Sequence, residues 1–121
     1  MEPKYYTPTL NEFFDGFEYE SLDLVWNKTT FDFRDLEVID DEIREGKIRV
    51  KHLDREDIES FGFVYSNVNS EYYSLNGFDL TNLDNNYFNI YEDKGADEYC
   101  FRGTIKNKSE LKKLMQMLNI I

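Results

Sequence analysis

The feature that most constrains the fold is a series of short alternating segments in the second half of the chain. Asn76-Gly77 separates residues 72–75 from residues 78–80, and Asn-Gly between two alternating segments is the strongest short-range hairpin signal. Residues 87–91 alternate again between apolar and polar positions, and residues 99–105 return as a further strand. The second half therefore predicts an antiparallel β-meander.

The N-terminal region adds a short helix and one or two strands. Thr9 and Glu12 have the spacing of a capping box, which predicts a short helix after Thr9. Residues 17–20 alternate as a half-buried strand does. Residues 24–31 predict a second strand, or a hairpin whose turn lies near Asn27-Lys28.

The middle of the chain changes to a helical period. Leu36, Ile39 and Ile43 recur at helical spacing and predict an amphipathic helix, which Gly46 ends. Residues 48–51 then alternate strictly, which predicts a strand with a basic outer face.

Two further helices complete the pattern. Asp54 predicts the N-cap of a short helix that stops at Gly62, and residues 63–65 restart a strand. Ser109 is expected to cap a C-terminal amphipathic helix, whose apolar residues recur with a core-facing spacing.

These elements predict an α+β fold. We expect about six or seven mainly antiparallel strands, with about three or four short helices packed on them. The chain has 121 residues and no linker rich in Pro, Gly or Ser, which favours a single domain over residues 1–121. Residues 1–8, which hold both prolines, are a candidate flexible arm.

The charge of the chain narrows the classes of partner. There are 25 Asp and Glu residues against 14 Lys and Arg, so the formal net charge is −11. Such a surface repels the phosphates of nucleic acids and anionic lipids, so we expect basic partners and no nucleic-acid or membrane binding. No apolar run approaches the ~18 residues of a membrane span. The start of the chain lacks a secretory pattern and there is one cysteine, so we expect a cytoplasmic protein.

The sequence gives little support to enzyme chemistry. His52 is the only imidazole, which excludes a zinc site that needs two histidines. Cys100 lies in an aromatic strand, where we expect a buried inert thiol rather than a catalytic partner for His52. Glu92-x-Lys94 has a nuclease-like spacing but ends a strand at a predicted turn, and residues 93–98 lack the ligand register of a calcium loop. Four other polar side chains are interpreted as turn formers: Asp79, Asn82, Asp84 and Asn85. We therefore expect no catalytic activity, no cofactor and no metal.

The carboxylates gather in clusters on the predicted helices. The candidate protein-binding residues are Asp35, Glu37, Asp40, Asp41, Glu42, Glu45, Asp54, Glu56, Asp57 and Glu59. Asp40–Arg44 is a favourable pair at i, i+4, whereas Asp41–Glu45 is repulsive at the same spacing. One interpretation is a solvated helix face that keeps the protein in solution. The other is that fixed carboxylates engage a basic, nucleic-acid-binding groove of another protein.

Tight binding would also require apolar anchors, because exposed charges alone add little affinity. The candidate anchors are Tyr5, Tyr6, Tyr72, Tyr73, Tyr87 and Tyr91. For each tyrosine, packing in the core or on a sheet face is the alternative role.

Three segments carry a resemblance. GKIRVKHLDREDIESFGF at residues 46–63, YYTPTL at residues 5–10 and GFEYE at residues 16–20 together resemble small uncharacterised proteins of bacteriophages and prophages. The resemblance implies a mobile-element setting and carries no catalytic residues. Small acidic proteins of that setting often bind a host nuclease and block its nucleic-acid site. The resemblance thus implies a monomeric anti-CRISPR or anti-restriction inhibitor, with a CRISPR effector nuclease or a restriction enzyme as its basic partner in the host cytoplasm.

Two other functions stay open at this point. A structural or assembly protein of the phage particle should self-associate at moderate concentration. A small hydrolase that uses carboxylates and a divalent ion should lose its activity with a chelator and with Glu92→Ala.

Overall fold

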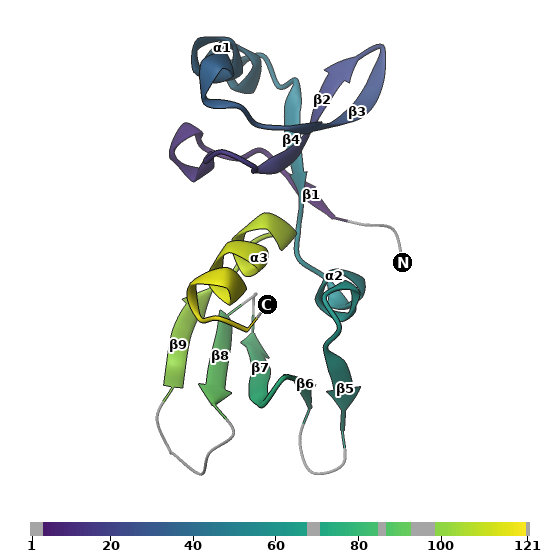
Figure 1. Cartoon of the computed structure of the whole chain (residues 1–121). Helices are drawn as coiled ribbons and strands as arrows, with labels where there is room; N and C mark the ends of the chain where they lie inside the picture. Colours follow the sequence, from purple (N-terminus) through teal and green to yellow (C-terminus); the bar gives the residue numbers. More distant parts are fainter. Residues whose placement is uncertain (1–3, 68–70, 85–86, 93–98, 121) are drawn as a thin grey trace. The chain divides into compact units, whose positions relative to one another are not determined.

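Figure 1 shows the computed structural model of the chain, which describes residues 4–67, 71–84, 87–92 and 99–120. The chain packs into two compact units, Met1–His52 and Leu53–Ile121. No helix in the described ranges is long and apolar enough to span a membrane. The expectation of a single domain over the whole chain stays a prediction.

The first unit is a four-stranded antiparallel sheet in the order β1-β4-β2-β3, with one α-helix and two 3₁₀ helices. Its elements are β1 (Tyr5–Tyr6), η1 (Leu10–Glu12), β2 (Glu18–Asp23), β3 (Val25–Thr30), η2 (Phe33–Asp35), α1 (Leu36–Arg44) and β4 (Ile48–Lys51). Strict alternation in β4 buries Ile48 and Val50 while Arg49 and Lys51 lie on the other face, as predicted. Ile39 of α1 belongs to the same core cluster as the two buried β4 residues.

Two N-terminal predictions need correction. The capping box of Thr9 and Glu12 is present, but it opens only a three-residue 3₁₀ helix. The turn of the β2–β3 hairpin lies at Leu24, because Asp23 pairs with Val25, and Asn27-Lys28 falls inside β3. The register of a sheet follows the burial of its core residues, here Tyr19, rather than the turn propensity of single residues.

Arg49 connects the strands of the first sheet. Its guanidinium carbon lies 3.7 Å from the ring centroid of Tyr5 on β1 and 4.3 Å from that of Trp26 on β3. Its Nη2 donates to Oε1 of Glu20 on β2 over 2.9 Å. One side chain of β4 therefore contacts a residue of each of the other three strands.

β3 is an outer strand of this sheet, and two of its carbonyls are occupied by its own side chains. Asn27 Nδ2 donates to the carbonyl oxygen of Val25 over 3.0 Å. Thr29 Oγ1 donates to the carbonyl oxygen of Asn27 over 3.4 Å.

The second unit is a five-stranded antiparallel meander in the order β5-β6-β7-β8-β9. Its elements are α2 (Arg55–Ser60), β5 (Val64–Ser66), β6 (Tyr72–Leu75), β7 (Phe78–Asp84), β8 (Tyr87–Glu92), β9 (Tyr99–Thr104) and α3 (Lys108–Met117). Asn76 and Gly77 have φ angles of 51° and 83°, as a type I′ hairpin turn requires. The predicted meander and its Asn-Gly turn are confirmed.

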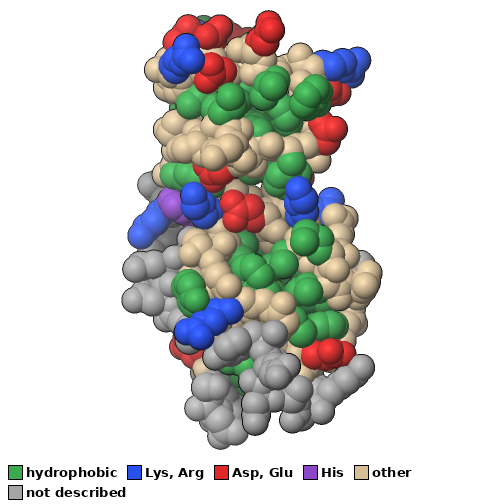
Figure 2. Space-filling model, turned by 90° about the vertical axis from the view of Figure 1, so that its left-hand side faces the viewer, with side chains coloured by type: hydrophobic (Ala, Val, Ile, Leu, Met, Phe, Trp, Pro, Cys, Tyr) green, Lys and Arg blue, Asp and Glu red, His purple; other side chains and the backbone are tan. Residues whose placement is uncertain are grey.

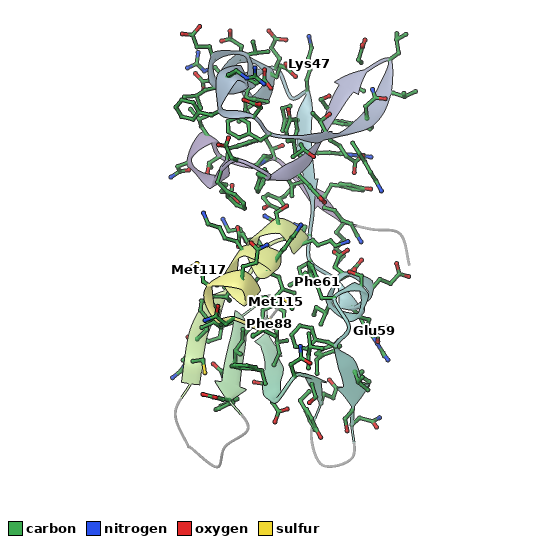
Figure 3. The ribbon with its side chains drawn as sticks, viewed as in Figure 1. Lys47, Glu59, Phe61, Phe88, Met115 and Met117 are labelled. Carbon is green, nitrogen blue, oxygen red and sulfur yellow. The ribbon has the colours of Figure 1, made fainter. Side chains whose placement is uncertain are left out.

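The core of the second unit lies on one face of this sheet. Phe88 and Ile90 of β8 pack in one cluster with Leu111 and Met115 of α3. Figure 3 shows Met115 close to Phe88, whereas Met117 lies on the outer side of α3 and is exposed.

The C-terminal helix begins earlier than the sequence pattern predicts. Asn107, and not Ser109, is its N-cap, and the side-chain oxygen of Asn107 accepts from the backbone N–H of Glu110 over 2.9 Å. Ser109 lies inside the first turn and is buried. Asn is as favourable an N-cap as Ser, and Asn107 has the extended backbone that an N-cap requires, so Asn107 and not Ser109 caps the helix.

The α+β class with antiparallel sheets and short helices is confirmed. The strands of the described residues divide between two sheets of four and five strands. Tyr5 and Tyr6, expected in an N-terminal arm, pair with β4 as strand β1.

Candidate protein-binding surface

The most acidic segment of the first unit, Asp32–Glu45, forms η2 and α1; we call it the η2–α1 surface. Asp32 caps η2 and accepts hydrogen bonds from both the backbone and the guanidinium of Arg34. These bonds lower the pKa of the exposed Asp32 carboxyl from 3.8 to about 2. This carboxylate therefore stays charged well into the acid range.

The carboxylates of α1 differ in their surroundings. Glu37, Asp41 and Glu45 are exposed, whereas Asp40 and Glu42 are half-buried. The predicted Asp40–Arg44 pair is confirmed at 2.7 Å, and Asp41 lies 4.0 Å from the same guanidinium. Glu45 pairs with Lys47 at 2.8 Å. Part of the negative charge of α1 is thus offset by basic neighbours, but Glu37 and Asp41 present carboxylates to solvent.

Asp35 is exposed and Glu42 is half-buried, and the charges of both act on Tyr19. Burial is the main cause that raises the pKa of Tyr19, and the negative charges of Asp35 and Glu42 raise it further. These two carboxylates therefore act on the buried tyrosine as well as on the surface potential.

Exposed apolar side chains lie among these carboxylates. Phe33 is 68% exposed, Val38 is 56% exposed and Leu36 is 37% exposed. Figure 2 shows hydrophobic side chains gathered on one face of the unit that carries α1, with carboxylates at their margin. This exposed apolar group was not predicted from the sequence, although Val38 falls outside the Leu36–Ile39–Ile43 stripe and could have indicated it.

The acidic residues of α2 have a mainly structural role. Asp54 and Asp57 form a reciprocal capping box, and Asp57 is buried. Glu59 pairs with Arg55 at 2.6 Å, and Glu56 is exposed. Of the four candidates here, Glu56 and Glu59 are therefore the ones that present carboxylates at the surface.

The tyrosines predicted as anchors are not exposed in the structure. Tyr73 is buried, and the others are half-buried: Tyr5, Tyr6, Tyr72, Tyr87 and Tyr91. Tyr6, for example, stacks on His52 with ring centroids 4.6 Å apart. Their surroundings support the alternative role in packing.

Three other sequence interpretations can be compared with the structure. Cys100 is exposed, so the expectation of a buried thiol was wrong. Its neighbour Phe101 packs on the core, and because successive side chains of a strand point to opposite faces, Cys100 lies on the other face. Asp79, Asn82 and Asp84 lie within β7 rather than in a turn, so the interpretation of these three residues as turn formers was wrong. Asn85, Lys94 and residues 93–98 lie outside the described residues. Within the described ranges, no three His, Cys, Asp or Glu side chains lie close enough together to hold a metal ion.

Comparison with known protein families, characterised proteins and solved structures finds no match to this chain.

Proposed function

We propose that this protein is a non-enzymatic inhibitor that covers a basic, nucleic-acid-binding surface of another protein with its η2–α1 surface. The partner class is a host defence nuclease, such as a CRISPR effector nuclease or a restriction enzyme. One observation carries the proposal: Phe33 and Val38 are exposed apolar side chains in the segment that also presents Glu37 and Asp41.

The two kinds of side chain have complementary roles in binding. Carboxylates on a rigid helix accelerate the encounter with a basic partner, and the net charge of −11 acts in the same direction. Exposed charges add little to final affinity, which depends on a few apolar residues that become desolvated in the complex. Phe33 and Val38 are such residues, so the η2–α1 surface combines rapid association, due to its carboxylates, with high affinity, due to its apolar side chains.

An inhibition assay tests the proposal. DNA cleavage by purified CRISPR effector nucleases and restriction enzymes is measured while the protein is titrated. We expect one nuclease to be inhibited at stoichiometric concentration, and we expect inhibition to weaken as salt rises. The double variant Phe33→Ser/Val38→Ser should weaken inhibition by roughly 30-fold, because the loss of an anchor pair costs about 2 kcal/mol or more.

A matched control separates the surface from general effects. Met117→Ser removes an exposed apolar side chain of α3 and should leave inhibition unchanged. The charge reversals Glu37→Lys and Asp41→Lys should slow association and reduce the salt dependence. Inhibition by the Phe33/Val38 variant at the wild-type level would show that this surface is not the contact. If the protein inhibits no nuclease but forms large assemblies in light scattering, the phage-assembly function is supported in its place.

A further inference from the structure

Leu24 alone forms the apex of the β2–β3 hairpin, because Asp23 pairs with Val25. Its φ is 65°, in the left-handed region that leucine adopts only at a cost and that glycine or asparagine adopts more readily. Its side chain is 99% exposed, so it contributes almost no packing in return. Residues held in a costly backbone conformation cluster at functional sites, and a contact outside the chain therefore explains the leucine at this position.

The apex projects beyond the paired part of the sheet and carries further apolar side chains. β4 pairs with β2 at Glu20 and Ser21, so the hairpin from Leu22 onward extends past these pairs, as Figure 1 shows. Val25 is 64% exposed and Leu22 is 39% exposed, and both lie within two residues of Leu24. Exposed apolar side chains that gather in this way mark interaction sites. Because the apex is convex, it fits a concave apolar pocket on another molecule.

The end of the hairpin lies beside the C-terminal end of α1, and its surroundings are acidic. The backbone N–H of Leu22 donates to the carbonyl oxygen of Lys47 over 2.8 Å, and that of Lys47 donates to the carbonyl oxygen of Glu42 over 2.9 Å. Figure 3 shows Lys47 between α1 and the hairpin. The pKa of Lys47 is raised, chiefly by its hydrogen bond with Glu45 and by the charge of Glu45, and further by the charges of Glu42 and Asp23. Three carboxylates thus lie around one lysine, and the negative η2–α1 surface continues to the apex of the hairpin.

We propose that Leu24 and Val25 are a second anchor of the inhibitor, which enters an apolar pocket beside the basic surface of the partner nuclease. This inference rests on the proposed function and adds a contact that selects among basic partners. Charge complementarity favours the same partner, because the carboxylates of the η2–α1 surface continue to Asp23, which is exposed next to Leu24. The same carboxylates disfavour an anionic membrane as the acceptor of the apex. An apex that is already ordered loses little freedom in the complex, so burial of Leu24 adds to affinity.

Variants of Leu24 test the anchor in the DNA-cleavage titration described above. Leu24→Gly removes the side chain and relieves the left-handed strain, so we expect inhibition to weaken at least ~10-fold while the urea midpoint of the protein does not fall. Leu24→Asn places a residue that tolerates positive φ and should weaken inhibition to the same extent. Leu24→Met retains an apolar side chain and should inhibit within about threefold of wild type. Val64→Ser in β5 removes an apolar side chain that is 68% exposed, and as the matched control it should leave inhibition unchanged.

The outcomes separate this anchor from the proposed function. If Leu24→Gly and Leu24→Asn inhibit like wild type while Phe33→Ser/Val38→Ser does not, the apex is not an anchor and the proposed function stands. If the protein inhibits no nuclease, both proposals are wrong.

Vesicles of neutral phosphatidylcholine test a membrane as the alternative acceptor of the apolar apex. We expect the wild-type protein to stay in the supernatant when the vesicles are sedimented. Co-sedimentation that Leu24→Gly abolishes would show that the apex enters lipid, and would overturn the pocket on a partner protein.

Discussion

Replacing Arg49 by methionine should destabilise the first unit more than any surface charge replacement. The change keeps a long side chain but removes the guanidinium, which stacks between Tyr5 and Trp26 and pairs with Glu20. Arg49 has a side-chain exposure of 27% and Glu20 one of 16%, so the pair is largely shielded from solvent.

The magnitude follows from these contacts. Each cation–π contact contributes ~0.5–1 kcal/mol at a partly exposed site, so the two rings together account for about 1–2 kcal/mol. The charge-assisted hydrogen bond to Glu20 contributes about 1.5 kcal/mol, taken at the low end because Arg49 is partly solvated. Since methionine retains some contact with the rings, we expect a loss of about 2–3 kcal/mol in the free energy of unfolding.

Urea denaturation followed by tryptophan fluorescence measures this loss. Trp26 is the only tryptophan, and it lies in the unit that contains Arg49, so its emission reports on that unit. The expected loss corresponds to a midpoint lower by roughly 1–2 M urea. Glu20→Gln and the double variant complete a mutant cycle, in which we expect a coupling energy of about 1 kcal/mol.

Arg44→Met is the matched control for Arg49→Met. Arg44 has a side-chain exposure of 72% and pairs with Asp40 at the surface, so its replacement should cost less than about 1 kcal/mol. If Arg49→Met costs no more than Arg44→Met, the argument that one arginine holds the four strands together is refuted.

Three further predictions concern single positions. Leu24 is 99% exposed and has a φ of 65°, so Leu24→Gly should stabilise the first unit by roughly 0.5–1 kcal/mol, because relief of left-handed strain outweighs the added chain entropy; a urea midpoint that does not rise would contradict this. The pKa of Asp32, lowered to about 2 from 3.8, means that its contribution to stability is complete above pH 4 and is lost as the pH falls through 2; carboxyl NMR should show this midpoint, and Arg34→Ala should return it toward 3.8. Cys100 is exposed, so a thiol reagent should modify one thiol per chain without denaturant, and protection until the chain unfolds would contradict its placement.

Elements with a strong local signal could be predicted from the sequence. Asn76-Gly77 adopts positive φ at low cost, and Gly46 and Gly62 end their helices with positive φ. The residue types at these positions therefore suffice to predict the turns. The turn at Leu24 could not be found in this way, because leucine has no preference for the left-handed region. The pairing of β2 with β3 imposes that turn.

The candidate surface shows the same division between local and non-local information. The sequence located the carboxylates of α1 and the capping role of Asp54, because both depend on helical spacing. It did not show that Asp57 is buried or that Phe33 is exposed, because burial depends on which residues pack against each face. Nor did it show that Asn89 of β8 is buried with a side-chain oxygen that accepts no hydrogen bond from the described residues, since both are properties of the assembled sheet.

The outer position of β3 has a consequence for the protein at high concentration. An outer strand of six residues normally offers its backbone as a template on which another chain can add a strand. The backbone N–H of Phe31 donates to the carbonyl oxygen of Phe17, so Val25, Asn27 and Thr29, which alternate with it, direct their backbone groups toward β2. The backbone groups of Trp26, Lys28 and Thr30 therefore point outward, and an antiparallel second copy that paired there would bring a second Lys28 close to the first. Repulsion between these charges opposes the strand-by-strand growth that leads to fibrils, although Leu24 and Val25 at the end of the strand are exposed.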